Sequence, residues 1–593
     1  MTTKLDDFLA WVPPADLPAD SRWAEYRRQS GLDPTLEVTG LGTTGGAATG
    51  RAALLTCGSR CSTGRDPSAQ ITLVLFGDPL GVGADPAADL ATRYATLGED
   101  FARDVHGSWT AIVTDARQGR ILAFTDRLNS RRLFHTEASG GGHWLSPDLR
   151  HIPKHGLAVD PIGVAWFLSN GAIHCGRTPY AGVSVLEAAS AHELGPFGLE
   201  SRQYWQYPFA PDESGGDEKR LGDELVQLLQ AGVERCSRNT DNVWLSLSGG
   251  YDSRTISAML ERAGTRDVTC FSYSHGQPTA GTDAWVAYQI AEQVHYSHQV
   301  IESYRGDLAA HIKHNARMGQ GVAPVCDEID GWLELGKRVE TAAHDGAPPV
   351  LLVGDHYLPD SPGGPHKESP PGRVRRFGVV EWLSARLPSD TYRAFHDGVE
   401  SDLDSLCEGI ARAASRIDNF LYLGQRVPNV LLPWRHAFAG PYFNVRTPFL
   451  DNDVMDFLAT VPGPVERSTF YHDAIVRTFP GVFSLPFATA AGYCPQFVNE
   501  FARNADRCRR LIRERPSRLD DVVSPDVGLG LVDWVERTRS LPARLKRRVS
   551  GMLGLGGKPS GAGAEQSKKP ERAGETVVLR RYLVLREALA DNR

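Results

Sequence analysis

The sequence predicts an α/β protein in which a β-rich N-terminal part precedes a larger part built on a parallel sheet. Strand-like runs dominate from about residue 50 to residue 150, and short apolar runs alternate with helical patterns after about residue 240. Such alternation is typical of a parallel sheet, because the chain needs a crossover, usually a helix, to return to the same edge. The length of 593 residues is itself typical of two or more domains.

In the N-terminal part, residues 71–77 form an apolar run ended by glycine and are predicted to be a strand. Residues 109–115 and 121–126 flank a short polar turn and are predicted to form a hairpin. Between these elements, residues 85–105 carry apolar side chains at helical spacing, which predicts a helix.

In the larger part, residues 221–236 show helical spacing, and three short apolar runs are predicted to be buried strands. The strands are expected at 243–247, 268–273 and 348–355. Residues 380–480 are predicted to be mostly helical.

The overall charge and the apolar runs exclude some partners. The formal net charge of −8 gives no basic footprint for nucleic acid, so any anion site must be local. The sequence has no uninterrupted apolar run of about 18 residues, so no membrane span is expected. Acidic residues stand near Met1 where a signal peptide would carry positive charge, and nine scattered cysteines suit a reducing compartment. We therefore expect a cytoplasmic protein.

The most informative stretch follows the strand that ends at Leu247. Two glycines in the loop let the backbone approach a ligand closely, and the N–H groups of the helix that starts at once would face an anion. An aspartate in such a loop would repel phosphate unless a cation lies between them, so Asp252 is predicted to hold Mg²⁺. The alternative is an ordinary strand-to-helix turn with Asp252 as a cap. The predicted phosphate-binding set is Leu247, Ser248, Gly249, Gly250, Tyr251, Asp252 and Ser253.

This loop resembles the pyrophosphate loop of the PP-loop ATP pyrophosphatases, in the branch of asparagine synthetases and β-lactam synthetases. It is not a Walker loop, since no Gly-Lys-Ser/Thr follows. A second match lies at residues 444–451, which resemble the Arg-x-Pro-Phe-Leu-Asp signature of that branch. The resemblance implies that ATP is cleaved to AMP and pyrophosphate with Mg²⁺ as cofactor, and that a carboxylate becomes an acyl-adenylate.

The resemblance also implies roles for residues at the ends of other strands. It places Tyr273 in contact with adenine, although such a tyrosine is more often a packing residue. It places Gly354 and Asp355 on the lining of the nucleotide and acyl pocket, with Asp355 either a catalytic or positioning acid or a turn residue.

The sequence leaves the roles of two further residues open. Asp360 is a candidate second metal ligand, but the position where the family usually has an acid is Leu358 here. Arg446 is a candidate catalytic residue that steadies a phosphate, or it buttresses the fold through Asp451.

The N-terminal part resembles the glutaminase domain of asparagine synthetases, an Ntn-type α/β/β/α sandwich. The similar stretches are residues 106–112, 125–134 and 144–147. The nucleophilic cysteine that such a glutaminase needs after the initiator Met is replaced by Thr2. We therefore expect a degenerate glutaminase-like domain, with the amine supplied from solution or by the substrate itself.

A second departure concerns the amide-forming step. Ligating members carry a lysine after Leu-Pro that stabilises the developing oxyanion. The matching stretch here, residues 485–493, contains no lysine, and Arg477 and Arg435 are the candidate substitutes. The sequence thus supports adenylation more strongly than ligation.

Together these observations predict a degenerate Ntn-type domain (1–210), a PP-loop synthetase domain with a parallel sheet and helical extension (218–550), a disordered linker (551–575) and a C-terminal strand or helix (576–593). The expected function is an ATP-dependent, AMP- and pyrophosphate-forming amide synthetase that joins a small-molecule carboxylate to an amine in a biosynthetic pathway. One alternative is a cyclase that closes a peptide macrolactam, as lasso-peptide cyclases do. Another is a nucleotide-binding scaffold without catalysis. The oligomeric state is open, with a homodimer as one option.

Overall fold

The computed structural model describes residues 8–12, 38–42, 52–57, 60–138, 141–154, 156–195, 198–208, 214–342, 348–356, 374, 377–410, 420–539 and 574–590. The candidate residues Thr2, Leu358 and Asp360, and most of the expected linker 551–575, lie outside these ranges.

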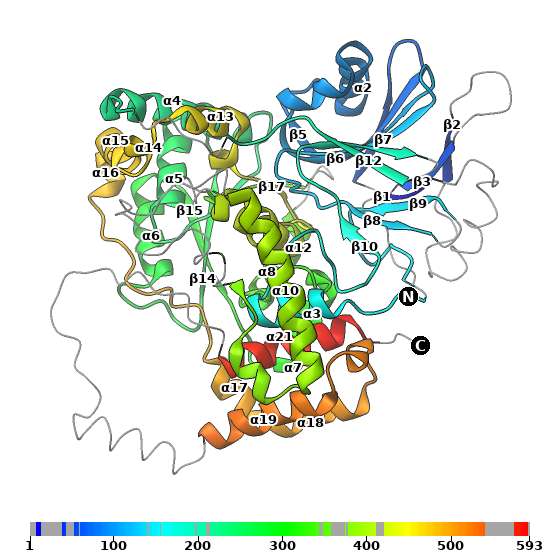
Figure 1. Ribbon diagram of the computed structural model, residues 1–593. Helices are drawn as coiled ribbons and strands as arrows, with labels where there is room; N and C mark the ends of the chain where they lie inside the picture. The colour runs from blue at the N-terminus through cyan, green and yellow to red at the C-terminus, as the bar shows by residue number, and fades with distance from the viewer. Residues whose placement is uncertain are drawn as a thin grey trace.

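Two antiparallel sheets form the N-terminal part (Figure 1). The first has the order β10-β8-β9-β1-β3-β2, with strands β1 (Phe8–Val12), β2 (Val38–Gly42), β3 (Ala52–Cys57), β8 (Phe134–Glu137), β9 (His143–Ser146) and β10 (Val183–Val185). The second has the order β12-β11-β7-β6-β5-β4, with strands β4 (Cys61–Arg65), β5 (Ile71–Leu80), β6 (His106–Asp115), β7 (Arg120–Thr125), β11 (Ser190–Gly195) and β12 (Gly198–Gln203).

Side-chain alternation along the strands stacks these sheets into four layers. In β1, Phe8 and Ala10 pack against the second sheet, whereas Leu9 and Trp11 belong to the core shared with α3 (Pro161–Asn170). The other face of the second sheet is covered by α2 (Pro86–Leu97). The order helix, sheet, sheet, helix confirms the predicted α/β/β/α sandwich.

The predicted N-terminal elements all form, with one change. The hairpin pairs β6 with β7, but the helix expected over 85–105 ends at Leu97 and continues as the 3₁₀ helix η1 (Gly98–Asp104). Gly98 has a φ of +62°, a positive value that glycine adopts without strain.

The third sheet is parallel, as predicted, and has the order β15-β14-β13-β16-β17. Its strands are β13 (Val243–Ser246), β14 (Thr269–Ser274), β15 (Ser297–Glu302), β16 (Val350–Leu352) and β17 (Asn444–Arg446). The chain builds outward from β13 to β15 and then returns to the other side of β13 with β16. In open parallel sheets, ligands bind beyond the carboxyl ends of the strands at such a reversal.

Helices cover both faces of this sheet (Figure 1). One apolar core lies beneath α4 (Glu218–Ser237), α5 (Asp252–Arg262), α6 (Asp283–Gln293), α13 (Asn452–Thr460) and α15 (Phe470–Thr478). The opposite core lies beneath α8 (Ile329–Ala342) and α12 (Leu432–Phe438). The sheet is thus buried on both faces, as its apolar strand sequences predicted.

The remaining helices complete the region predicted to be mostly helical and extend it. They are α7 (Leu308–Gly319), η3 (Glu381–Ala385), α10 (Ser389–Ile410), the π-helix η5 (Tyr422–Leu431), η6 (Pro448–Leu450), α14 (Gly463–Glu466), α16 (Pro480–Phe483), α17 (Phe497–Arg503), α18 (Ala505–Glu514), η7 (Arg518–Asp521), α19 (Pro525–Arg539) and α21 (Glu575–Ala588). The C-terminal segment, expected as a strand or a helix, is the helix α21, and its apolar residues share a core with α3 and α19.

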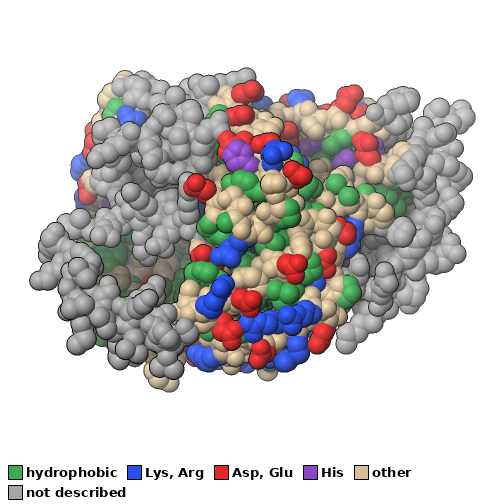
Figure 2. Space-filling model, turned by 60° about the horizontal axis from the view of Figure 1, so that its bottom comes forward, with side chains coloured by type: hydrophobic (Ala, Val, Ile, Leu, Met, Phe, Trp, Pro, Cys, Tyr) green, Lys and Arg blue, Asp and Glu red, His purple; other side chains and the backbone are tan. Residues whose placement is uncertain are grey.

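Acidic and basic side chains are interspersed on the face that carries α18 and α19 (Figure 2). Arg509, for example, pairs with Asp506, Asp533 and Glu536. Among the described helices, none combines the length and apolar character that crossing a lipid bilayer requires.

Candidate nucleotide site

The predicted phosphate loop lies at the reversal point of the parallel sheet, between the end of β13 and the start of α5. Its shape is fixed by short-range hydrogen bonds. Ser248 N donates to Ser253 Oγ at 3.0 Å, and Gly250 N donates to Ser248 Oγ at 3.2 Å. Gly249 N donates to Asp283 Oδ1 at 3.0 Å, which ties the loop to the start of α6.

Three N–H groups of this loop remain available to a ligand. Those of Tyr251, Asp252 and Ser253, at the start of α5, make no hydrogen bond to the described part of the protein. The first N–H groups of a helix have no partner within the helix, and the helix dipole places partial positive charge at the same end. The loop therefore presents three N–H groups at the positive end of the α5 dipole.

Asp252 stands beside these N–H groups and faces the turn that follows β16. His356 Nε2 lies 3.1 Å from Asp252 Oδ1. A Cβ atom added at Gly354 would lie 2.8 Å from Asp252 Cβ and 3.1 Å from Ser253 N, so only glycine allows this close approach. The two loops on either side of the sheet reversal thus meet at Asp252.

A segment after α16 packs against the phosphate loop. Arg254, whose side chain is fully buried, donates to the carbonyl groups of Leu485 at 2.9 Å and Pro486 at 2.7 Å. Ala488 N donates to Gly249 O at 3.2 Å. Burial lowers the pKa of Arg254 to about 10. This segment includes residues 485–493, which lack the lysine of ligating family members. Arg254 is the buried cation against which the segment packs.

A second charged cluster surrounds Asp355. Arg435 donates to both carboxylate oxygens of Asp355, at 2.8 and 3.1 Å, and both side chains are largely buried. Burial raises the pKa of Glu328 to about 7, the Asp327 carboxylate adds to the rise, and Arg435 opposes it. A carboxyl group with such a pKa can exchange a proton near neutral pH.

Tyr273 has packing contacts in the structure. Its ring meets Phe271 and Trp332 edge-on, at centroid distances of 5.7 and 5.6 Å. A Cβ atom added at Gly331 would lie 2.5 Å from the Tyr273 ring, so the ring is tightly enclosed on that side.

Arg446, for which the sequence left a catalytic and a structural role open, makes structural contacts. Its guanidinium donates to Asp78 Oδ2 at 2.6 Å and Oδ1 at 3.1 Å, and to Cys236 O at 2.6 Å. Asp78 belongs to β5 of the N-terminal sandwich, so this side chain joins the sandwich to the parallel sheet. The acid that pairs with Arg446 is thus Asp78, whereas the sequence suggested Asp451.

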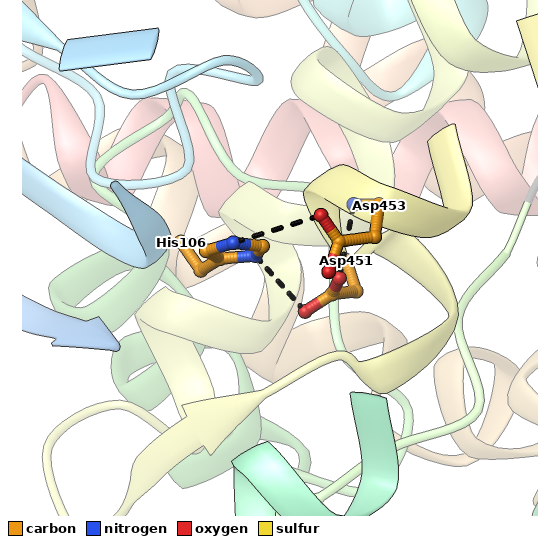
Figure 3. Close-up of side chains that lie close together, drawn as sticks. All are labelled: His106, Asp451 and Asp453. Atoms are coloured by element: carbon orange, nitrogen blue, oxygen red, sulfur yellow. Dashed lines mark hydrogen bonds and ion pairs between the residues drawn. The ribbon is translucent and has the colours of Figure 1, made fainter. Parts of the chain in front are cut away.

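Asp451 instead belongs to a cluster with His106 and Asp453 (Figure 3). His106 Nδ1 lies 3.2 Å from Asp451 Oδ2, and His106 Nε2 lies 3.9 Å from Asp453 Oδ1. The guanidinium of Arg235 pairs with both aspartates. Burial raises the pKa of Asp451, but the hydrogen bonds from His106 and Arg235 outweigh that effect, so the pKa lies below its usual value. Because Arg235 already supplies the cation, the cluster is a contact between β6 and α13 rather than a metal site.

Several residues at this edge of the sheet were not selected from the sequence. Asp283, Glu328 and His356 come from other segments, and only the fold brings them to the loop. Arg254 directly follows Ser253, but its place in the sequence does not show that its side chain is buried. Asp283 offered one signal, since an acid at the start of a predicted helix commonly lies near a strand end.

Comparisons with known proteins match both parts of the chain. Residues 224–333 match the family model described as "Asparagine synthase", and residues 87–205 match the one described as "Glutamine amidotransferase domain". Neither model extends over half of the chain.

Three curated proteins are similar to parts of the chain. Asparagine synthetase [glutamine-hydrolyzing] 2 of Bacillus subtilis is 23% identical over 36% of this chain and 30% of its own length. A putative asparagine synthetase [glutamine-hydrolyzing] 2 of Methanocaldococcus jannaschii is 26% identical over 31% of this chain and 35% of its own length. The tRNA-specific 2-thiouridylase MnmA of Beijerinckia indica is 31% identical over 20% of this chain and 29% of its own length. The chain thus spans about a third of the length of the curated relatives it matches.

Among solved structures, the NH3-dependent NAD synthetase of Campylobacter jejuni in complex with the nitrate ion matches 35% of this chain and 97% of that chain, with 14% identity and a TM-score of 0.19.

Proposed function

Because the chain is an asparagine synthase-like family member, we propose that it is an ATP-dependent amide-bond synthetase that releases AMP and pyrophosphate. The observation that carries the proposal is the phosphate loop itself. Three unpartnered N–H groups and one carboxylate meet at the carboxyl edge of a parallel sheet, at the point where strand order reverses. That geometry suits the diphosphate of a nucleotide better than a neutral ligand.

In the first step, a substrate carboxylate oxygen attacks the α-phosphorus of ATP. The bond between the α-phosphorus and the oxygen that bridges it to the β-phosphorus breaks, and pyrophosphate leaves with that oxygen. The N–H groups of Tyr251, Asp252 and Ser253 would bind the negative charge that develops on pyrophosphate. The hydroxyl groups of Ser248 and Ser253 would orient its oxygens.

The residues around the loop fit a bound Mg²⁺ ion. Magnesium is commonly held by one or two carboxylates together with substrate phosphates, and Asp252 places a partly exposed carboxylate beside the N–H groups of the loop. Asp252, with Asp360 as the second proposed ligand, would hold the ion. When bound, Mg²⁺ would neutralise part of the phosphate charge.

In the second step, an amine nitrogen attacks the acyl carbon, and the bond to AMP breaks. Glu328 is the proposed acceptor of the proton that the amine loses, because its pKa of about 7 suits that role near neutral pH. Arg435, positioned by Asp355, is the proposed cation beside the developing oxyanion. The sandwich would serve as a scaffold, and the amine would come from solution or from the substrate.

The proposal is tested by ATP–pyrophosphate exchange across a panel of small carboxylic acids and peptides, followed by product analysis. Exchange that depends on a particular acid, with AMP as the nucleotide product, is expected. Release of ADP and phosphate would contradict the proposed cleavage. ATP binding without exchange for any acid would favour a nucleotide-binding scaffold.

A further inference from the structure

A second site lies away from the phosphate loop, where the N-terminal sandwich meets α7 and α12. A cavity of about 380 Å³ opens there, between the residues around β8 and β9 on one side and the ends of α7 and α12 on the other. Its size is that of a small-molecule site.

The lining of this cavity is strongly cationic. Its arginines are Arg60, Arg131, Arg132, Arg150 and Arg317. Among the described residues of the lining, the one acid is Asp148, which pairs with Arg150. Within this described lining the arginines therefore outnumber the acids, although the whole chain has a net charge of −8.

Arg132 shows how this charge is held. Its guanidinium donates to the main-chain carbonyl groups of Val322, Pro428 and Asn429, at 3.2 to 3.3 Å. Its side chain is 7% exposed, and burial lowers its pKa to about 10. Among the described residues, no carboxylate pairs with it. A buried cation satisfied only by carbonyl groups is costly, and an anion in the cavity would offset that cost.

His436 lies in the same positive electrostatic field. Its two ring nitrogens are buried and have no hydrogen-bond partner in the described part of the chain. Burial lowers its pKa, and the nearby charges of Arg131 and Arg60 lower it further. His436 therefore has hydrogen-bonding capacity that the described residues leave unused beside the cavity.

Because several arginines line this cavity, we infer that it binds a small oxyanion, that is, a molecule with a carboxylate or phosphate group. This site is separate from the phosphate loop. The helix α12 divides the two sites. Arg435 on this helix bonds Asp355 at the carboxyl edge of the sheet, whereas the next residue, His436, lines the cavity. Arginine suits such a ligand, because its planar group can donate two hydrogen bonds to carboxylate or phosphate.

The test is calorimetric titration of inorganic phosphate, and separately of citrate, into the full chain. We expect at least one of the two anions to bind with a dissociation constant below about 1 mM. Tighter binding of phosphate would identify a phosphate-bearing ligand, and tighter binding of citrate would identify a carboxylate. The absence of binding by both anions would overturn the inference.

Single-residue variants test where on the protein the anion binds. Arg132→Met is expected to weaken it about tenfold or more, as for a lost charge-assisted hydrogen bond, and Arg317→Met at the exposed rim about threefold. Because Arg317 is exposed, its variant should fold even if Arg132→Met does not. Arg238→Met removes an exposed arginine elsewhere and should bind the anion like the wild type. Binding of wild-type strength in both Arg132→Met and Arg317→Met would place the anion outside this cavity and refute the second site.

Discussion

The guanidinium carbon of Arg254 lies 4.2 Å from the centroid of the Phe487 ring. This contact joins the first turns of α5 to the segment that follows α16. The same guanidinium donates to the carbonyl groups of Val482 and Gly249, at 3.1 and 3.3 Å. One buried side chain therefore holds both the phosphate loop and the segment packed on it.

Arg254→Met is expected to lower the free energy of unfolding by about 3 kcal/mol, because it removes four hydrogen bonds from a buried guanidinium to main-chain carbonyl groups. Urea-induced unfolding measures this change. The matched control is Arg262→Met, an exposed arginine on the same helix, which should change stability by less than about 0.5 kcal/mol. Equal losses in the two variants would mean that Arg254 does not hold the segment in place.

The sequence predicted the parallel sheet and the loop between β13 and α5 because both depend on local patterns. Apolar runs ending in glycine define β13 and its loop, and the helix that starts at Asp252 follows directly. The partners Asp283 and Arg435 come from distant segments, and no spacing along the chain encodes that they meet at one edge of the sheet. The partner of Arg446 could not be predicted for the same reason, since its motif is visible in the sequence but Asp78 lies 368 positions away.

Docking of the N-terminal sandwich through Arg446 and Asp78 predicts energetic coupling between these residues. In a double-mutant cycle with Arg446→Met and Asp78→Asn, the coupling measured by chemical unfolding should be about 2 kcal/mol. Both single variants should reduce pyrophosphate release to a similar extent. If Arg446→Met abolished release while Asp78→Asn left it intact, Arg446 would belong to the nucleotide site after all.

The pKa of Glu328 predicts a dependence of stability on pH. Its value of about 7 in the folded protein lies above the ordinary value of 4.5. The folded state therefore favours the protonated form, and this contribution to stability is complete below about pH 4.5 and is lost as pH rises through about 7. The change amounts to about 3 kcal/mol, since one pH unit between the two pKa values is worth about 1.4 kcal/mol.

The Glu328→Gln variant has no carboxyl group at this position, so its stability should not fall with pH in this way. Relative to the wild type, the variant should gain about 3 kcal/mol of stability between pH 5 and pH 8, as measured by urea unfolding at a series of pH values. Glu340→Gln, at an exposed position of α8, should follow the wild type throughout. A constant difference between Glu328→Gln and the wild type across this range would show that Glu328 has an ordinary pKa.

Substitution of Arg435 should affect the two proposed half-reactions to different extents. Arg435→Met should lower the rate of amide formation by about 10²-fold or more, as for loss of one group that stabilises an oxyanion. ATP–pyrophosphate exchange should fall by less than about tenfold, because the first step depends on the phosphate loop. Arg426→Met, an exposed arginine on η5, is the control. An equal fall in both rates would assign Arg435 to the first step or to the fold.

The central claim is that the loop from Ser248 to Ser253 binds the phosphates of ATP together with a cation held by Asp252. Calorimetric titration of ATP into wild type, Asp252→Ala and Asp390→Ala, with and without Mg²⁺, tests it most directly. Asp390 is the matched control, because it is an exposed acid in the first turn of another helix, α10. We expect Mg²⁺ to strengthen ATP binding in the wild type and in Asp390→Ala, and Asp252→Ala to remove this gain. Equal Mg²⁺-dependent binding in all three proteins would contradict it.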